Sequence, residues 1–213
     1  IGSNDGTCLN FFKEKGMKVV GVDPAKDIAE KASAAGINTI PDFFGYEISI
    51  GLRKTYGPAK FITSHNACAH IDDLYDVFKG VKNWLDQDGI FVLEVGYLAD
   101  VFNNTWFDTI YHEHFSYFSF FVIQKIFLSK GLTIIDVEEI PTHGGSLRIF
   151  AKHSENKLFE ITENIENLIK KEKQMGLDNY SVYSDFSQKV KNVKNGLNQF
   201  LEKAELEGKS TVC

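Results

Sequence analysis

The sequence predicts an α/β protein built on an open, doubly wound parallel sheet. Short β-branched runs alternate with helical segments, and a glycine-rich turn opens the chain ahead of the first helix. Polar side chains cluster where the strands end, which is the edge at which sheets of this type bind ligands. These three observations define the fold class and the expected place of a site.

Four helix and strand pairs follow the opening turn in order. Apolar residues spaced by three and four define the helices, and β-branched runs define the strands. Gly16 and Gly36 stop the first two helices, and Pro24 closes the first strand. The fourth helix is expected to be capped by Asp72 or Asp73. Helices are predicted over residues 8–15, 26–35, 46–55 and 74–85, and strands over residues 18–23, 37–40, 60–64 and 89–95.

Two more strands and three more helices complete the prediction. Gly131 stops the helix that precedes the last two strands, and these strands are expected to pair antiparallel around a loop over 141–145. Beyond His153 the apolar residues keep helical spacing up to Gly208. The helices are predicted over residues 119–129, 158–169 and 183–204, and the strands over residues 132–138 and 147–152.

This pattern divides the chain into a sheet domain over 1–153, a helical linker over 154–208 and the start of a truncated C-terminal domain over 209–213. A glycine turn normally follows a strand, so the first strand of the sheet is expected to be missing. Residues 210–213 have the pattern of a strand that is just beginning. We therefore expect the chain to be a fragment.

Composition narrows the class of function. The formal net charge is -6, and the basic residues are scattered, so binding to nucleic acid or to an anionic membrane is not expected. The three cysteines lie far apart and form no C-x-x-C pair, which fits a reducing cytoplasm better than a disulfide framework. No apolar run reaches the roughly 18 to 20 residues that a membrane span needs.

The glycine loop is a candidate cofactor site. Gly2 and Gly6 let the backbone approach a ligand closely, and the amides of Ser3, Asn4 and Asp5 lie between them at the start of a helix. The spacing departs from G-x-G-x-x-G, which disfavours a dinucleotide, and the arrangement is the one used for S-adenosylmethionine. The alternative is a tight turn without a ligand.

Strand ends beside this loop add further cofactor candidates. Asp23 and Pro24 end the next strand, where the carboxylate can accept hydrogen bonds from ribose hydroxyls. His65 and Asn66 end the strand over 60–64, together with a second imidazole at His70. For both histidines the alternative is a structural hydrogen bond to nearby backbone.

The stretch from Tyr111 to His114 is the candidate reaction centre. It holds a phenol, two imidazoles and a carboxylate in four residues. Imidazole titrates near neutrality, a carboxylate can orient it, and a phenol can hydrogen-bond a developing oxyanion. If the chain is extended here, alternation places His112 and His114 on opposite faces, so one metal ion could hardly use the whole cluster. We therefore predict proton transfer rather than a metal site; an aromatic loop with satisfied polar tips is the alternative.

Taken together, several blocks resemble the S-adenosylmethionine-dependent C-methyltransferases of nucleotide-linked deoxysugars. The blocks occur in the order of that family, and the Tyr-His-Glu-His block with its leading Phe-Asp-Thr-Ile is the most specific of them. Asp23 stands where Glu is common in the family. The matching blocks are residues 1–7, 20–24, 69–71, 107–114 and 143–148.

The resemblance implies a Rossmann-like methyltransferase sheet, S-adenosylmethionine as cofactor and a thymidine-diphosphate-linked 4-keto-6-deoxysugar as substrate. It implies that His114 removes the proton next to the ketone, with Tyr111 and Glu113 beside it, and that His70 holds or protonates the enolate oxygen. It also implies a cysteine-rich zinc module before this chain and a second α/β domain after it. The oligomeric state, the sugar and the methylated carbon stay open.

Two other functions fit a sheet of this class. A nicotinamide-dependent sugar-nucleotide oxidoreductase or epimerase would need a pyrophosphate-type glycine loop and a Tyr-x-x-x-Lys pair, but Phe115 stands four residues after Tyr111. A non-catalytic nucleotide-binding or assembly module would depend on the long helices instead.

Overall fold

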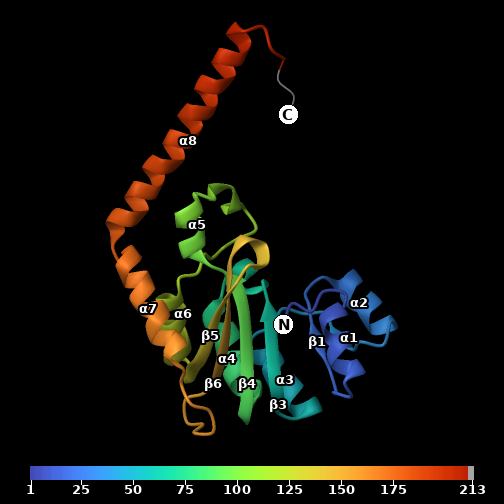
Figure 1. The fold of residues 1–213 in the computed structure, drawn as a ribbon. Helices are drawn as coiled ribbons and strands as arrows, with labels where there is room; N and C mark the ends of the chain where they lie inside the picture. The colour runs from blue at the N-terminus through green and yellow to red at the C-terminus, as the bar shows by residue number, and fades with distance from the viewer. Residues whose placement is uncertain (211–213) are drawn as a thin grey trace.

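The computed structural model describes residues 1–210, and Figure 1 shows a central sheet flanked by helices, with a long C-terminal helix that projects away from the sheet. The expected strand start over 210–213 lies outside the described residues apart from Ser210. The strands are β1 (Gly21–Val22), β2 (Thr39–Ile40), β3 (Ala59–His65), β4 (Leu85–Gly96), β5 (Leu132–Ile140) and β6 (Ser146–His153). The α-helices are α1 (Thr7–Glu14), α2 (Lys26–Ala34), α3 (Tyr46–Tyr56), α4 (Leu74–Trp84), α5 (Leu98–Asn104), α6 (Phe120–Ser129), α7 (Glu163–Met175) and α8 (Tyr180–Leu206).

The strands form two hydrogen-bonded groups that the start of the chain joins. β1 pairs with β2 in parallel, and the other group has the order β3-β4-β6-β5. The Ile1 ammonium donates to the Thr63 carbonyl oxygen at 2.8 Å, and the Gly2 amide donates to the Val22 carbonyl oxygen at 2.9 Å. Residues 1 and 2 therefore lie between β1 and β3, with their backbone in line with the sheet.

The predicted fold class is confirmed, including the antiparallel pair of β5 and β6. β3 and β4 are parallel, whereas β6 runs antiparallel to both β4 and β5 and lies between them. The parallel strands end at one edge of the sheet, and β6 begins at that same edge. Polar residues from three different strands therefore meet there.

Several element boundaries differ from the prediction. β1 covers only 21–22 because residues 18–20 have no partner strand within the described residues 1–210; they and β3 line a cavity of about 530 Å³. β4 begins at Leu85 rather than Gly89, since α4 already ends at Trp84. The sequence pattern did not indicate α5. Asp73 caps α4 by accepting from the Asp76 amide, as one of the two expected acids.

The helix expected over 158–169 is wrong in its position. α7 starts only at Glu163, because the Thr162 amide donates to the Ile135 carbonyl oxygen of β5 at 2.9 Å and holds the chain extended up to that point. Leu158 and Ile161 are exposed. The long helix α8 agrees with its prediction within three residues at each end, and only its first turns pack on the body, where Phe102 meets Phe186.

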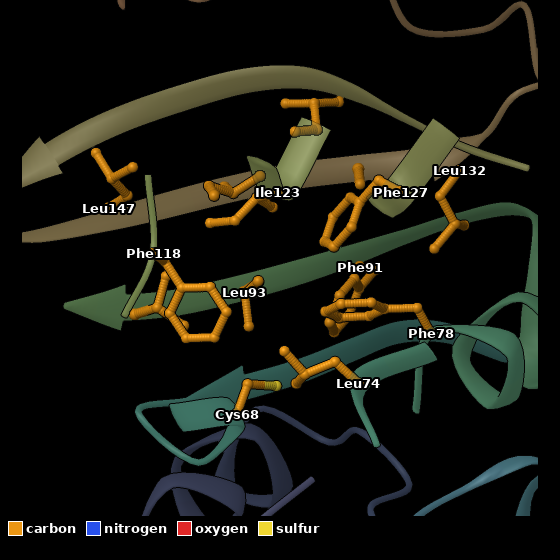
Figure 2. Packing of buried hydrophobic residues seen from close by; sticks show 14 of the residues in the cluster. Cys68, Leu74, Phe78, Phe91, Leu93, Phe118, Ile123, Phe127, Leu132 and Leu147 are labelled. Atoms are coloured by element: carbon orange, nitrogen blue, oxygen red, sulfur yellow. The ribbon is translucent and has the colours of Figure 1, made fainter. Parts of the chain in front are cut away.

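The core is aromatic and lies between the sheet and two helices. Figure 2 shows Phe78 of α4, Phe91 of β4 and Phe127 of α6 in mutual contact. The ring centroids of Phe78 and Phe127 are 4.6 Å apart in an edge-to-face arrangement, and those of Phe91 and Phe127 are 5.8 Å apart. This contact ties both helices to the strand that carries the site.

A buried carboxylate fastens α7 to α6. The Glu172 carboxylate accepts from the amides of Phe120 and Phe121, the first two residues of α6, at 2.6 and 2.9 Å. These amides have no partner within their own helix, so Glu172 satisfies donors that would otherwise be buried alone. Burial raises the pKa of Glu172, and the two hydrogen bonds oppose that shift. No helix within residues 1–210 combines the length and the apolarity needed to cross a membrane.

The core contact leads to a stability prediction. Replacing Phe127, which is fully buried, by alanine should lower the free energy of unfolding by about 3 to 5 kcal/mol, through lost burial and a residual cavity. The neighbouring Leu128→Ala is the control, because this side chain is 55% exposed. Urea unfolding measures both variants, and similar losses would contradict this account of the core.

The buried His153 leads to a pH prediction. Its Nε2–H donates to the Leu85 carbonyl oxygen at 3.1 Å, and Nδ1 has no partner among the described residues. Burial lowers the pKa of His153, against the effect of the Leu85 bond. In the unfolded chain His153 therefore takes up a proton near pH 6.5, whereas in the folded chain it stays neutral to lower pH. Protonation of the unfolded chain thus lowers the free energy of unfolding as the pH falls.

The free energy of unfolding should thus decline from about pH 7.5 to about pH 5.5 more steeply in the wild type than in His153→Gln. The exposed His112→Gln serves as the control and should retain the slope of the wild type. Equal slopes in all three proteins would refute this assignment.

Candidate active site

Two cavities meet at the edge of the sheet where the parallel strands end. One has a volume of about 320 Å³ and lies against the glycine loop; the other has a volume of about 360 Å³ and lies against the Tyr111–His114 turn. Asn66 and His70 line both cavities. The volumes are within the range of small-molecule sites, and the shared wall places two ligands side by side.

The glycine loop closes over the first cavity. Gly2 has φ of 64°, and a β-carbon at this position would come within 2.4 Å of the Ala67 β-carbon. Only glycine therefore fits between the loop and the turn that follows β3. Apart from Ser3, Asp5 and Gly6, the wall contains every residue predicted to bind the cofactor, together with the aromatic side chains of Phe43 and Phe44. The predicted members are Gly2, Asn4, Asp23, Pro24, His65 and Asn66.

The Asp23 carboxylate holds the backbone around this cavity and can still accept hydrogen bonds from a ligand. Its two carboxylate oxygens accept from the amides of Asn4 at 2.8 Å and Ala25 at 2.9 Å. Each oxygen keeps a second lone pair, so the carboxylate can still accept from ligand hydroxyls. The aromatic side chains and the acid at the strand end fit the adenine and ribose parts of S-adenosylmethionine.

The three predicted cofactor residues that are absent from the cavity wall shape the loop. Ser3 packs under Gly21, and its buried hydroxyl has no partner among the described residues. Gly6 caps α1 with φ of 81° and packs on Ile37. Asp5 accepts from the Thr7 amide at 3.0 Å, and this hydrogen bond lowers its pKa.

The second cavity contains the predicted base in a defined tautomer. The Thr109 carbonyl oxygen lies 3.2 Å from Nδ1 of His114, and a carbonyl only accepts, so Nδ1 carries the proton of the neutral ring. Nε2 is then the free lone pair, and the Tyr111 hydroxyl donates to it at 3.0 Å. A proton acceptor and a phenol donor thus lie together at the cavity wall.

A second imidazole faces the first across the cavity. The rings of His70 and His114 meet edge to face, with centroids 4.9 Å apart. The Glu113 carbonyl oxygen accepts from Nδ1 of His70 at 3.0 Å, which leaves Nε2 of His70 for a ligand. The Phe115 amide donates to the Ala69 carbonyl oxygen at 2.8 Å and locks the two segments together.

The Tyr111–His114 stretch is a turn and not an extended segment. The His114 amide donates to the Tyr111 carbonyl oxygen at 3.1 Å, so the alternation assumed for an extended chain does not apply here. His112 and Glu113 are exposed and lie outside the cavity wall. A backbone carbonyl orients His114 where a carboxylate was expected, and Glu113 contributes its own carbonyl to His70.

The structure adds residues that the sequence reasoning missed. Trp106 and His143 line the second cavity, and Gly144 packs on the Trp106 ring. Glu94 is 5% exposed near the end of β4, where it contacts Arg148. The sequence could have pointed to Glu94, because it is an acidic residue inside an otherwise apolar strand. Within residues 1–210 no group of three or more His, Cys, Asp or Glu side chains is arranged to hold a metal ion.

The fold is shared with solved structures, one of which is a methyltransferase. Magnesium protoporphyrin IX methyltransferase from Synechocystis, crystallised with bound SAH, is 13% identical with a TM-score of 0.55, over 72% of each chain. The PH0226 protein from Pyrococcus horikoshii is 15% identical with a TM-score of 0.54, over 71% of this chain and 79% of that one. These likenesses show the class of fold, a Rossmann-like α/β sheet.

Sequence comparison narrows this class. Residues 1–137 match the model of a methyltransferase domain, and residues 141–213 match that of the C-methyltransferase C-terminal domain. C-methyltransferase NovU from Streptomyces niveus is 34% identical over 210 residues, which is 99% of this chain and 50% of that protein. The chain belongs to the S-adenosylmethionine-dependent C-methyltransferase family, and it spans half the length of this relative.

The fit of Gly2 leads to a prediction about cofactor binding. Gly2→Ala adds a left-handed backbone strain of about 1 to 2 kcal/mol and a clash with Ala67, so the affinity for S-adenosylmethionine should fall at least about tenfold. Gly16→Ala is the matched control, because Gly16 has φ of 82° but open space around it. Calorimetric titration of the full-length protein measures the affinity of both variants for S-adenosylmethionine. Equal affinities would contradict the role of the close fit between Gly2 and Ala67 in cofactor binding.

Proposed function

We propose that the whole protein transfers a methyl group from S-adenosylmethionine to the carbon next to the keto group of a nucleotide-linked 4-keto-6-deoxysugar. The single observation that carries this proposal is the second cavity, where a free imidazole nitrogen lies beside a phenol and a second imidazole. A C–H bond next to a ketone is broken by such a base only if the enolate oxygen is stabilised. The identity with C-methyltransferase NovU supports carbon as the methyl acceptor.

In this reaction His114 is the base. Its Nε2 lone pair takes the proton, and the electron pair of the C–H bond becomes the double bond of the enolate while the carbonyl electrons move to oxygen. Because the Thr109 carbonyl fixes the proton on Nδ1, Nε2 is already in its basic form. Restoring the carbonyl returns the electron pair to carbon, which would form the new C–C bond to the methyl group while the S–CH₃ bond breaks and the sulfur leaves with that electron pair as a neutral thioether.

Tyr111 and His70 stabilise the enolate oxygen. The Tyr111 hydroxyl now donates to Nε2 of His114, and it is free to donate to the enolate once Nε2 carries the substrate proton. His70 as an imidazolium keeps its bond to the Glu113 carbonyl and offers the other N–H to the same oxygen. His70 can then give this proton to the enolate oxygen and take it back when the carbonyl re-forms, or it can keep the proton and only hydrogen-bond the oxygen.

The first cavity would hold the cofactor. Gly2 and Asn4 would face its amino acid part, Asp23 its ribose, and Phe43 and Phe44 its adenine. When bound, S-adenosylmethionine supplies an electrophilic methyl group on a sulfonium. Asn66 and His70 line both cavities, so the two ligands would lie next to each other beside these residues. The methyl group would pass from one ligand to the other there.

The proposal is tested with the full-length protein, S-adenosylmethionine and a nucleotide-linked 4-keto-6-deoxysugar in deuterated water. We expect exchange of the hydrogen next to the ketone, followed by NMR, and a methylated product detected by mass spectrometry. His114→Ala should lower both rates by about 10² to 10⁴. His112→Ala is the matched control, since this exposed side chain lies outside the cavity, and it should stay within about twofold.

Absence of both exchange and product in the wild type would sink the proposed reaction. A wild-type rate in His114→Ala would instead show that His114 is not the base.

A further inference from the structure

Glu94 is a buried acid that contacts the His65–Asn66 turn and that the proposed reaction does not use. It lies two residues before the end of β4, and its side chain is 6% exposed. Its carboxylate receives donors from three residues on two neighbouring elements. We propose that Glu94 is a positioning residue that holds the His65–Asn66 turn in place between the cofactor and substrate cavities, with Arg148 fixing its carboxylate.

Arg148 neutralises Glu94 from the neighbouring strand. The two residues are direct cross-strand partners in β4 and β6. Nε and Nη2 of Arg148 donate to Oε2 of Glu94 at 3.3 and 3.1 Å. A buried carboxylate needs a charged partner and further donors, and this pair supplies the first of them. Arg148 also reaches the exposed Glu138 of β5 at 3.5 Å, on the opposite side.

The other donors come from the turn after β3. Nδ2 of Asn66 lies 3.4 Å from Oε1 of Glu94, and Nδ1 of His65 lies 3.4 Å from Oε2. A carboxylate only accepts, so Nδ1 of His65 carries a proton and Nε2 accepts from the Thr63 hydroxyl. The backbone amide of Asn66 donates to the Glu94 carbonyl oxygen at 2.8 Å.

This turn is strained and therefore depends on its partners. Asn66 has φ of 53°, which lies in the left-handed region. This conformation costs energy for a residue with a β-carbon, and contacts with the surroundings must offset that cost. Ala67, the next residue, is the one against which Gly2 packs. A shift of the turn would thus move the glycine loop and the wall that both cavities share.

The contacts separate this effect from proton abstraction. His70 and His114 are held by the carbonyls of Glu113 and Thr109, and neither bond involves Glu94. Loss of the Glu94 charge should therefore loosen the cofactor side of the site and leave the base and its partner in place. The proposal rests on the proposed function for its kinetic readout, but its binding readout is independent of it.

The test compares Glu94→Gln with Glu138→Gln in the full-length protein. Both variants remove one carboxylate from Arg148, but only the first also replaces one of the two acceptor oxygens of Glu94 by an NH₂ donor. We expect Glu94→Gln to raise the Kd for S-adenosylmethionine about tenfold and to lower the methyl transfer rate similarly. Hydrogen exchange next to the ketone should change less than about threefold, so the ratio of transfer to exchange falls.

Glu138→Gln should leave the Kd and this ratio unchanged. Should Glu94→Gln fail to fold, Arg148→Lys provides the same test, because it keeps the charge but loses the two-point contact; it should shift the Kd in the same direction by about threefold. Circular dichroism and thermal unfolding establish that each variant is folded.

Two results would overturn the positioning role. One is a Kd and a ratio in Glu94→Gln equal to those of Glu138→Gln. The other is an equal fall of exchange and transfer, which indicates a general loss of structure. If the wild type shows neither exchange nor transfer, the proposed function fails, whereas calorimetric titration of the cofactor still decides the role of Glu94.

Discussion

The site depends on a small set of hydrogen bonds between the turn after β3 and the turn after α5. The Phe115 and Ser116 amides donate to the Ala69 carbonyl oxygen, and the His70 imidazole donates to the Glu113 carbonyl oxygen. These bonds join segments more than 40 residues apart in the chain. Without them the two imidazoles would not meet, and the second cavity would lose one of its walls.

The strand order explains why so many polar groups reach one edge. β3 and β4 are parallel, and His65, the last residue of β3, is the register partner of Glu94 near the end of β4. β6 starts at the same edge because it runs in the opposite direction, and it brings Arg148 beside Glu94. The Tyr97 amide donates to the Gly145 carbonyl oxygen and holds the β5–β6 loop against the same region. One antiparallel strand thus adds both a charge and a cavity wall.

Local patterns in the sequence were sufficient for the sheet but not for the site. Helical spacing and β-branched runs predicted the alternation of elements and the edge at which His65, Asn66 and Asp23 lie. They could not predict that Lys18 to Val20 lack a strand partner among the described residues, since pairing depends on a distant backbone. They also gave no sign that Thr162 would bond to β5 and delay the next helix.

The Tyr111–His114 turn shows the same limit within four residues. An extended chain would place Glu113 and His114 on opposite faces, whereas the turn sends the Glu113 side chain outward and its carbonyl inward. The acid that adjacency suggested as the partner of the base is thus replaced by backbone. The proton chemistry stays a prediction from residue type; the backbone carbonyl selects the same tautomer of His114 that a carboxylate would, because both only accept from Nδ1.

Backbone orientation also bears on how the proposed base would work. A carboxylate beside His114 would stabilise the imidazolium and could retain the proton, whereas the neutral Thr109 carbonyl fixes the ring with less charge stabilisation. The proton on Nε2 is then easier to release after each turnover. The Tyr111 hydroxyl donates to Nε2, and in the proposed reaction the same hydroxyl would turn to the enolate oxygen when the nitrogen becomes a donor. One phenol can therefore serve the resting base and the enolate in succession.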